Sequence, residues 1–259
     1  MTGRTYGTRL PGLTAEKLPG RLIVIEGADG SGRSTEVTLL KDWLEVAGHA
    51  VVDTGLRRSD LVSGQIDQAK TGHTLGATTM ALLYAVDFAD QLENKIVPAL
   101  SAGSTVLADR YTYTLMARAI VRGASRKWAR ELYGFALRPD LVMFLDARPV
   151  ILLHRAIGKY GSLDYWESGM DLCLSRDLFE SFFLYQDRLS KEFDWMAREY
   201  GFHRIDANRA PAQVHWDVQC LVAPLYGETP PPAPPGGPPM EVPAVPVPPS
   251  RGRRRAASG

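Results

Sequence analysis

A glycine-rich stretch, Gly27-Ala28-Asp29-Gly30-Ser31-Gly32-Arg33-Ser34-Thr35, lies between a short apolar run and a run with helical spacing. The apolar run Leu22–Glu26 predicts a buried strand, and Ser34–Ala47 carries apolar residues along one helix face. Glycines allow backbone N–H groups to close around phosphate oxygens, and the N-terminus of the following helix adds a partial positive charge. The chain is therefore expected to fold around a phosphate-binding unit of strand, loop and helix.

The loop matches the pattern GxxxxGK[ST] at each defined position except that Arg33 replaces the lysine. Arginine carries the same charge on a larger planar fork and still binds phosphate bidentately. Two alternatives to a working phosphate loop stay open here. One is a glycine-rich turn without a ligand, and the other is a nucleotide-binding relic with poor catalysis.

Short apolar runs alternate with longer amphipathic runs from residue 21 to residue 226. Further strands are expected at His49–Thr54, Thr105–Ala108, Leu141–Asp146 and His203–Asp206. Helices are expected at Leu75–Leu100, Thr112–Val121, Ser125–Leu137, Leu172–Tyr200 and Pro211–Val222, with another beginning at Pro149. Strands that alternate with helices predict an α/β fold with a five-stranded parallel sheet, flanked by helices on both faces.

The two ends of the chain differ from this body. Residues 1–20 are expected to form a flexible N-terminal arm. Residues 227–259 are expected to be a disordered proline-rich tail with a basic end, since eleven of the 18 prolines fall between Pro230 and Pro249. Proline lacks the backbone N–H that a helix or an interior strand needs. Polyproline II or disorder is the expectation for this tail.

Composition narrows the function classes. The formal net charge of +1 gives no support to binding of nucleic acid or of a membrane through bulk charge. No apolar run approaches the roughly 18–20 residues that span a bilayer. The two cysteines, without a CxxC pair, argue against a disulfide scaffold and a cysteine-rich zinc site. A cytoplasmic location and no need for nucleic acid are therefore expected.

Further motifs follow the loop in a fixed order. They are ALLYAVDFADQLENKIVPAL at 81–100, LADRY at 107–111, PDLVMFLD at 139–146, LDYWE at 163–167 and IDA at 205–207. Together with IEGADGSGRST at 25–35, they resemble the thymidylate kinase family over about residues 20–222. The resemblance implies a P-loop NTPase-type three-layer fold with a mobile lid. It also implies phosphate transfer from ATP to dTMP for dTTP synthesis, with Mg²⁺ and as a homodimer.

The resemblance assigns the phosphate chemistry residue by residue. ATP is expected on Gly27–Thr35, with Arg33 at the β- and γ-phosphates. Asp29 matches a loop carboxylate near the acceptor phosphate and the metal. Asp109 and Ser34 match the groups that hold Mg²⁺, Asp109 through water, and Arg110 matches the arginine that grips the acceptor phosphate. Arg155 matches an arginine at the base of the lid and is a candidate for charge neutralisation during transfer.

The resemblance also assigns the acceptor side. Arg58 is similar to an arginine on the loop after the second strand, Tyr84 matches the aromatic that stacks on thymine, and Glu167 matches the lid glutamate. Phe88 stands where the family usually has an arginine that hydrogen-bonds the base, and Tyr165 replaces a lid arginine.

Two further pocket positions depart from the family, because Leu115 and Arg118 replace small, polar or aromatic residues. A kinase for a different nucleotide stays open because of these departures. A catalytically weak nucleotide-binding regulatory protein stays open because of Arg33.

Overall fold

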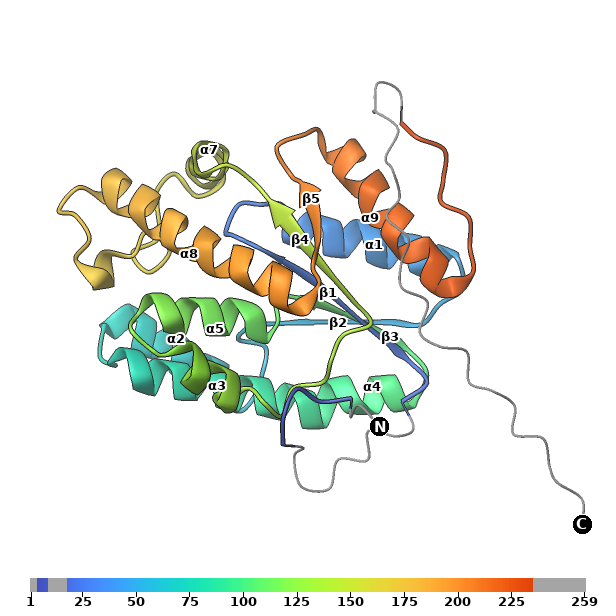
Figure 1. Ribbon diagram of the computed structural model, residues 1–259, viewed down its shortest axis with the longest axis horizontal. Helices are drawn as coiled ribbons and strands as arrows, with labels where there is room; N and C mark the ends of the chain where they lie inside the picture. The colour runs from blue at the N-terminus through green and yellow to red at the C-terminus, as the bar shows by residue number, and fades with distance from the viewer. Residues whose placement is uncertain (1–3, 9–17, 235–259) are drawn as a thin grey trace, which may run out of the picture.

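A computed structural model of the chain describes residues 4–8 and 18–234, and its centre is one parallel sheet (Figure 1). The five strands run in the spatial order β2-β3-β1-β4-β5, each parallel to its neighbour. Their bounds are β1 Arg21–Gly27, β2 Val51–Gly55, β3 Thr105–Asp109, β4 Leu141–Asp146 and β5 His203–Asp206. This confirms the predicted α/β architecture.

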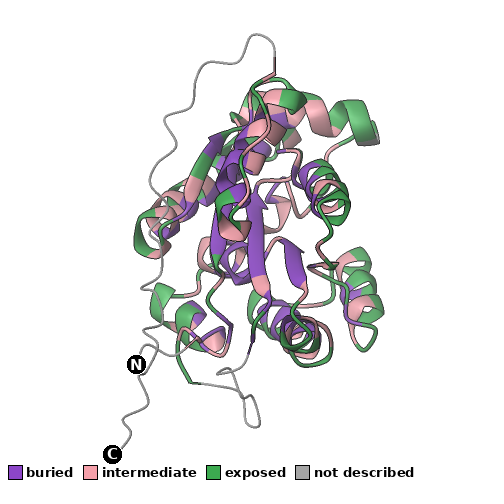
Figure 2. Cartoon of the chain, turned by 90° about the vertical axis from the view of Figure 1, so that its right-hand side faces the viewer, coloured by how far each residue is buried: buried purple, intermediate pink, exposed green. Residues whose placement is uncertain are grey.

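Strand β1 lies at the centre and is buried on both faces. Ile23 and Ile25 point into one hydrophobic cluster, while Leu22 and Val24 point into the other. Successive side chains of a strand alternate between faces, so a continuous apolar run is what a strand with helices on both sides requires. Figure 2 shows this pattern, with buried strands in the middle and exposed residues on the outer faces of the helices.

The helices form one layer on each face of the sheet (Figure 1). Helices α1 and α9 supply the cluster on one face, and their bounds are Arg33–Val46 and Pro211–Tyr226. The other cluster is covered by α2 Ser63–Gly72, α3 Ala77–Gln91, α4 Val97–Ser101, α5 Thr112–Val121, α6 Arg126–Leu132 and α8 Leu178–Tyr200. Helix α7, Pro149–Tyr160, leads from β4 to the segment 161–177.

Helix α2 was not predicted, because its periodic signal is weak. It buries only Ile66 and Ala69 among its ten residues, and the others are polar, small or glycine. The long helix expected at 75–100 is instead interrupted by a π-helical turn, Leu92–Ile96, which precedes Pro98 in the first turn of α4. A local widening of this kind lets a helix change the face that it presents.

Two other predicted helices are shorter than expected. Helix α6 ends at Leu132, because the chain beyond Tyr133 turns so that Leu137 can pair with Thr5. Helix α8 begins at Leu178, where the Asp177 side chain accepts a hydrogen bond of 2.8 Å from the Glu180 N–H. The helix begins here because the aspartate side chain accepts a hydrogen bond from an N–H that has no partner within the helix.

Residues 4–8 of the predicted arm lie against the body. Thr5 pairs with Leu137 in an antiparallel bridge, and the Arg138 N–H donates to the Arg4 carbonyl at 2.7 Å. The rest of the predicted arm at 1–3 and 9–17, and the predicted tail from 235 onward, lie outside the described residues. In the part of the chain that is described, no helix is both long and apolar enough to cross a membrane.

Candidate active site

The carboxyl ends of β1, β2 and β3 bring three loops together. The glycine-rich loop follows β1, the pair Arg57-Arg58 follows β2, and Arg110 directly follows β3. Parallel α/β sheets bind ligands at this edge, beside the point where strand order reverses. Strand β1 has β3 on one side and β4 on the other, so its loop lies at that point.

The loop after β1 requires glycine where it leaves the sheet. Gly27 has φ of 152°, and a Cβ atom on it would lie 2.8 Å from the Leu145 carbonyl oxygen of β4. Helix α1 then begins after Gly32 without a side-chain cap. The first N–H groups of a helix have no partner within the helix, and its N-terminus favours anions. They border a large cavity of about 840 Å³, which the loop and the segment 162–167 line.

The Arg33 guanidinium lies within this loop. Its Nη1 donates to the Gly27 carbonyl at 2.5 Å and also to the Ala28 carbonyl. Its Nε donates to Asp109 Oδ1 at 2.8 Å. The planar guanidinium therefore joins the loop to the end of β3 through hydrogen bonds in two fixed directions. The ammonium group of a lysine lacks this fixed geometry.

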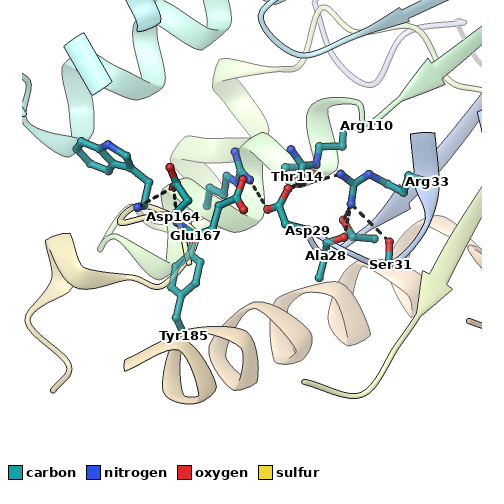
Figure 3. Close-up of polar contacts among 12 residues, drawn as sticks. Ala28, Asp29, Ser31, Arg33, Arg110, Thr114, Asp164, Glu167 and Tyr185 are labelled. Atoms are coloured by element: carbon teal, nitrogen blue, oxygen red, sulfur yellow. Dashed lines mark hydrogen bonds and ion pairs between the residues drawn. The ribbon is translucent and has the colours of Figure 1, made fainter. Parts of the chain in front are cut away.

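Two further arginines converge on Asp29 from outside the loop. Arg110 pairs with Asp29 Oδ1, and Arg118 donates to Asp29 Oδ2 at 2.9 Å. Arg33 Nη2 lies 3.6 Å from Asp29 Oδ1. Figure 3 shows Asp29 facing Arg110 and Arg33. The Asp29 carboxylate thus gathers the arginine side chains at a place where an anionic ligand could bind them.

A buried glutamate holds the loop that carries Arg110. Glu26 Oε1 accepts the Tyr111 N–H at 2.8 Å, and Oε2 accepts the Thr114 hydroxyl at 2.5 Å. Burial raises the pKa of Glu26, although these hydrogen bonds oppose the shift. Arg110 itself has φ of 72°, a conformation that costs a non-glycine residue energy and persists where its surroundings impose it.

The Arg110 guanidinium is also poorly compensated. Its Nε is buried without a hydrogen-bond partner among the described residues. Burial, followed by repulsion from Arg118, lowers the pKa of Arg110. Such a cation gains from a bound anion.

A second buried carboxylate, Asp87 of α3, holds the loop after β2. It accepts the Arg57 N–H and the Ser59 N–H, each at 2.9 Å. Burial raises the pKa of Asp87. Arg57 has φ of 59°, so this loop repeats the arrangement of the Arg110 loop. The Arg58 side chain, in contrast, is 38% exposed and pairs with Asp53 at 2.6 Å.

These loops border a cavity of about 160 Å³ that is rich in cations. We call it the arginine cavity, and its charged lining is Arg33, Arg57, Arg58, Lys70, Asp109, Arg110, Arg118 and Glu167. An apolar cavity adjoins it, lined by Met80, Tyr84, Leu115 and Tyr133 among others, with Lys70, Arg118, Arg122 and Glu167 at its polar side. The site therefore offers an anion-binding chamber between a phosphate loop and an apolar slot.

Comparisons with known proteins identify the family of the chain. The thymidylate kinase family model matches residues 25–218. The chain belongs to the thymidylate kinase family. A probable thymidylate kinase 2 of Saccharolobus solfataricus is 36% identical over 204 residues, covering 78% of this chain and 95% of the relative. A probable thymidylate kinase of Pyrococcus abyssi is 36% identical over 214 residues, covering 78% and 96%. The thymidylate kinase of Jannaschia sp. is 32% identical over 227 residues, covering 82% and 100%.

The structure separates two of the positions that the family resemblance assigned to the base. Tyr84 lines the apolar cavity. Phe88, one turn further along α3, is instead 4% exposed and packs its ring against Tyr111, Tyr133 and Phe135. Phe88 therefore packs in the core and lines none of the large, arginine and apolar cavities.

The segment expected to form the lid, residues 163–167, is held by α2, and Asp171 beyond it is held by α5. The Trp166 indole N–H donates to the Lys70 carbonyl at 3.0 Å. Arg122 of α5 pairs with Asp171 through Nε at 2.7 Å and donates to the Tyr185 hydroxyl at 2.8 Å. Glu167 lines the large cavity, the apolar cavity and the arginine cavity.

Arg155 lies at the outer side of the loop. Its Nη1 is 3.3 Å from the Gly30 carbonyl, and its Nη2 donates to the Ala207 carbonyl after β5 at 2.9 Å. It therefore joins the phosphate loop to the IDA motif at 205–207. Gly30 has φ of 83°, a backbone conformation that favours glycine.

Sequence reasoning missed the two carboxylates that hold the arginine loops. Glu26 stands at the end of an otherwise apolar run, and a charged residue in a strand buried on both faces is itself a signal of a specific partner. Asp87 gave no comparable signal. It lies on a helix with one solvent-exposed face, where a carboxylate is ordinary.

Proposed function

We propose that the protein transfers the γ-phosphoryl group of ATP to the 5′-phosphate of dTMP, giving ADP and dTDP. The observation that carries the proposal is the meeting of the three cavities: a phosphate loop, a chamber of arginines and an apolar slot with an aromatic wall. A reaction between two phosphorylated nucleotides needs this order of sites. Phosphoryl transfer itself requires positioning and charge neutralisation more than covalent chemistry.

On the donor side, the backbone of Gly27–Thr35 and the start of α1 would cradle the ATP phosphates. Arg33 would fix the loop to Asp109 and add positive charge near the β- and γ-phosphates. Arg155 would brace the loop from outside through the Gly30 carbonyl. The donor is thereby held in line with the arginine cavity.

On the acceptor side, Arg110 would bind the phosphate of dTMP. The phosphate would displace Asp29 from Arg110, because a phosphate dianion offers more oxygens to the guanidinium than a carboxylate does. Arg58 would assist from the rim of the cavity. Tyr84 would stack on the base, and Glu167 would close the slot from the lid.

We propose that Ser34 and Asp109 hold Mg²⁺ beside the phosphate loop. The Ser34 hydroxyl is exposed toward the large cavity, and the Asp109 carboxylate lies at the end of β3. In the described residues, no group of three His, Cys, Asp or Glu side chains forms a metal cage. Magnesium is commonly held by one or two protein oxygens together with substrate phosphates. Bound there, it would neutralise charge on the donor phosphates.

The experiment is ADP production from ATP and Mg²⁺ by the purified protein, with dTMP, dUMP, dGMP, dCMP and AMP offered separately. We expect turnover concentrated on dTMP. Turnover concentrated on another monophosphate would replace the acceptor in this proposal. ATP binding without turnover on any of them would contradict phosphotransfer and favour a regulatory role.

We propose that residues 21–226 form the kinase domain, with the arm and the proline-rich tail outside it, and that the enzyme acts in the cytoplasm. We also propose a homodimer that uses the outer face of α3, where Leu82 and Val86 are 45% and 43% exposed. Light scattering of the wild type and of the L82E/V86E double variant tests the dimer. We expect a dimeric wild type and a monomeric variant, and a monomeric wild type would contradict the proposal.

A further inference from the structure

Lys70 lies where the three cavities meet. Among the residues that the structure describes, only Lys70 and Glu167 line the large cavity, the arginine cavity and the apolar cavity together. Glu167 is an anion, so Lys70 is the cation at this junction. It comes from α2, the helix without a sequence signal, and it belongs to none of the motifs of the family resemblance.

The cations around Lys70 are already bonded to protein groups. Arg33 is bonded to loop carbonyls and Asp109, while Arg110 and Arg118 are paired with Asp29. In the described part of the chain, the Lys70 ammonium has neither a hydrogen bond nor an ion pair. The charges that face it are Arg57, Arg118, Asp164 and Glu167.

The setting of Lys70 also favours a bound anion. Burial, with smaller contributions from Arg57 and Arg118, lowers its pKa, while Asp164 opposes the shift. A half-buried ammonium without a bonded partner bears a desolvation cost that a phosphate oxygen would offset. Arg110 and Arg118 must each give up a contact with a carboxylate before they bind a phosphate, whereas Lys70 need not.

We infer that Lys70 contacts the phosphoryl group in transit between the two nucleotides. The inference rests on the proposed function. In the step, the bond between the γ-phosphorus and the β,γ-bridging oxygen breaks, and its electron pair stays on ADP. A new bond forms from an oxygen of the dTMP phosphate to the same phosphorus. The Lys70 ammonium neutralises charge on the equatorial oxygens, which lie at the junction of the donor and acceptor cavities.

The lid fixes the position of Lys70 through the backbone. The Trp166 indole N–H donates to the Lys70 carbonyl, and the His73 ring stacks on Trp166 with centroids 5.4 Å apart. His73 also meets the Tyr165 ring edge-on at 4.2 Å. The end of α2 therefore packs against residues 165–166 of the lid. This contact positions Lys70, which acts as a catalytic residue.

The test compares the variants Lys70→Met and Lys70→Arg with the wild type and with Lys127→Met. Lys127 is 84% exposed on α6 and lies outside the three cavities, so it is the matched control. The rate of ADP formation is measured with ATP, Mg²⁺ and dTMP each varied to saturation. Thermal melting and ATP binding establish that each variant is folded.

We expect Lys70→Met to lower kcat by about 10²–10³-fold with each KM within about threefold of the wild type, because the contact strengthens as charge develops. Lys70→Arg should restore at least a tenth of the rate, and Lys127→Met should match the wild type. A raised KM for dTMP with unchanged kcat would overturn the inference, as would an unchanged rate. A wild-type protein inactive on all monophosphates would instead overturn the proposed function, and this inference with it.

Discussion

The arginine cavity and the apolar cavity adjoin each other, yet they are built in opposite ways. Around the arginine cavity, two buried carboxylates, Glu26 and Asp87, pin loops whose arginines have positive φ. Around the apolar cavity, Met80, Leu115 and Tyr133 supply shape. Its polar side includes Arg122, whose guanidinium is taken up by Asp171, Tyr185 and two backbone carbonyls.

This difference determines which part of substrate recognition each cavity can perform. Loops fixed by buried polar bonds define the place of a phosphate closely, since leaving such groups unpaired is costly. A slot lined by apolar surface discriminates by fit, and fit alone separates substrates by modest factors. We therefore expect variants around the arginine cavity to change kcat, and variants of the apolar cavity to change KM for the nucleoside monophosphate.

The largest effect is expected for Arg110→Ala. Loss of the buried guanidinium removes a charge placed at the acceptor phosphate, and kcat/KM for dTMP should fall by about 10²–10³-fold. Steady-state kinetics measure it, with Arg176→Ala as the control because Arg176 is exposed and lines none of the three cavities. A loss of less than tenfold would remove Arg110 from the site.

Glu26→Ala tests whether buried carboxylates support this cavity. The change leaves the Tyr111 N–H and the Thr114 hydroxyl buried without their acceptor, which should cost about 2–4 kcal/mol of unfolding free energy. Urea unfolding measures it, and Glu45→Ala on the exposed side of α1 is the control. Equal stability of the two variants would mean that Glu26 does not hold the loop.

Arg33→Lys tests the role of the guanidinium within the phosphate loop. Lysine cannot reproduce the bonds to both the Gly27 carbonyl and Asp109, so we expect kcat to fall about tenfold, the loss of roughly one charge-assisted hydrogen bond. A gain in rate would show instead that the arginine impairs native catalysis. The same kinetic assay decides between the two results.

Tyr84→Leu should act on binding in the apolar cavity. Removing the ring should raise KM for dTMP by about 5–10-fold, as expected for loss of one stacking contact, with kcat nearly unchanged. Tyr84→Phe keeps the ring and should behave as the wild type. A fall in kcat with KM unchanged would contradict the division of labour between the cavities.

Asp53→Asn should have the smallest effect, at the rim of the arginine cavity. Hydrogen bonds from Lys41 and Arg58 lower the pKa of Asp53 to about 2, although burial opposes this. A lowered carboxyl pKa adds stability above the unfolded value of about 3.9 and loses it as pH falls toward 2. The variant should be less stable by under about 1 kcal/mol at pH 6, and this difference should shrink at pH 3. Urea unfolding at the two pH values measures it.

The sequence predicted the fold well wherever apolar periodicity was strong. The strand Leu141–Asp146 and the helix Thr112–Val121 have the predicted bounds, because both are rich in apolar residues that the two helix layers and the sheet bury. Helix α2 escaped prediction because it buries little, and Lys70 escaped with it.

The candidate site divides in the same way. The glycine-rich loop, Asp109 and Arg110 belong to local motifs, and they lie together at the carboxyl edge of the sheet. The partners of Arg33, and the arginines that meet at Asp29, depend on how distant segments pack, which spacing along the chain does not encode. Phe88 shows the converse, since a position within a motif turned out to be core.

The central place of β1 has a consequence for synthesis of the protein. Gly27 takes its conformation against the Leu145 carbonyl, and β1 pairs with β4 at Ile23 and Leu141. A growing chain that has exposed β1, α1 and β3 still lacks one wall of the phosphate loop. Pairing between segments this far apart in the sequence is intrinsically slow, because the loop between them must close first. We therefore expect the nascent polypeptide to gain native nucleotide affinity only after β4 has left the ribosome.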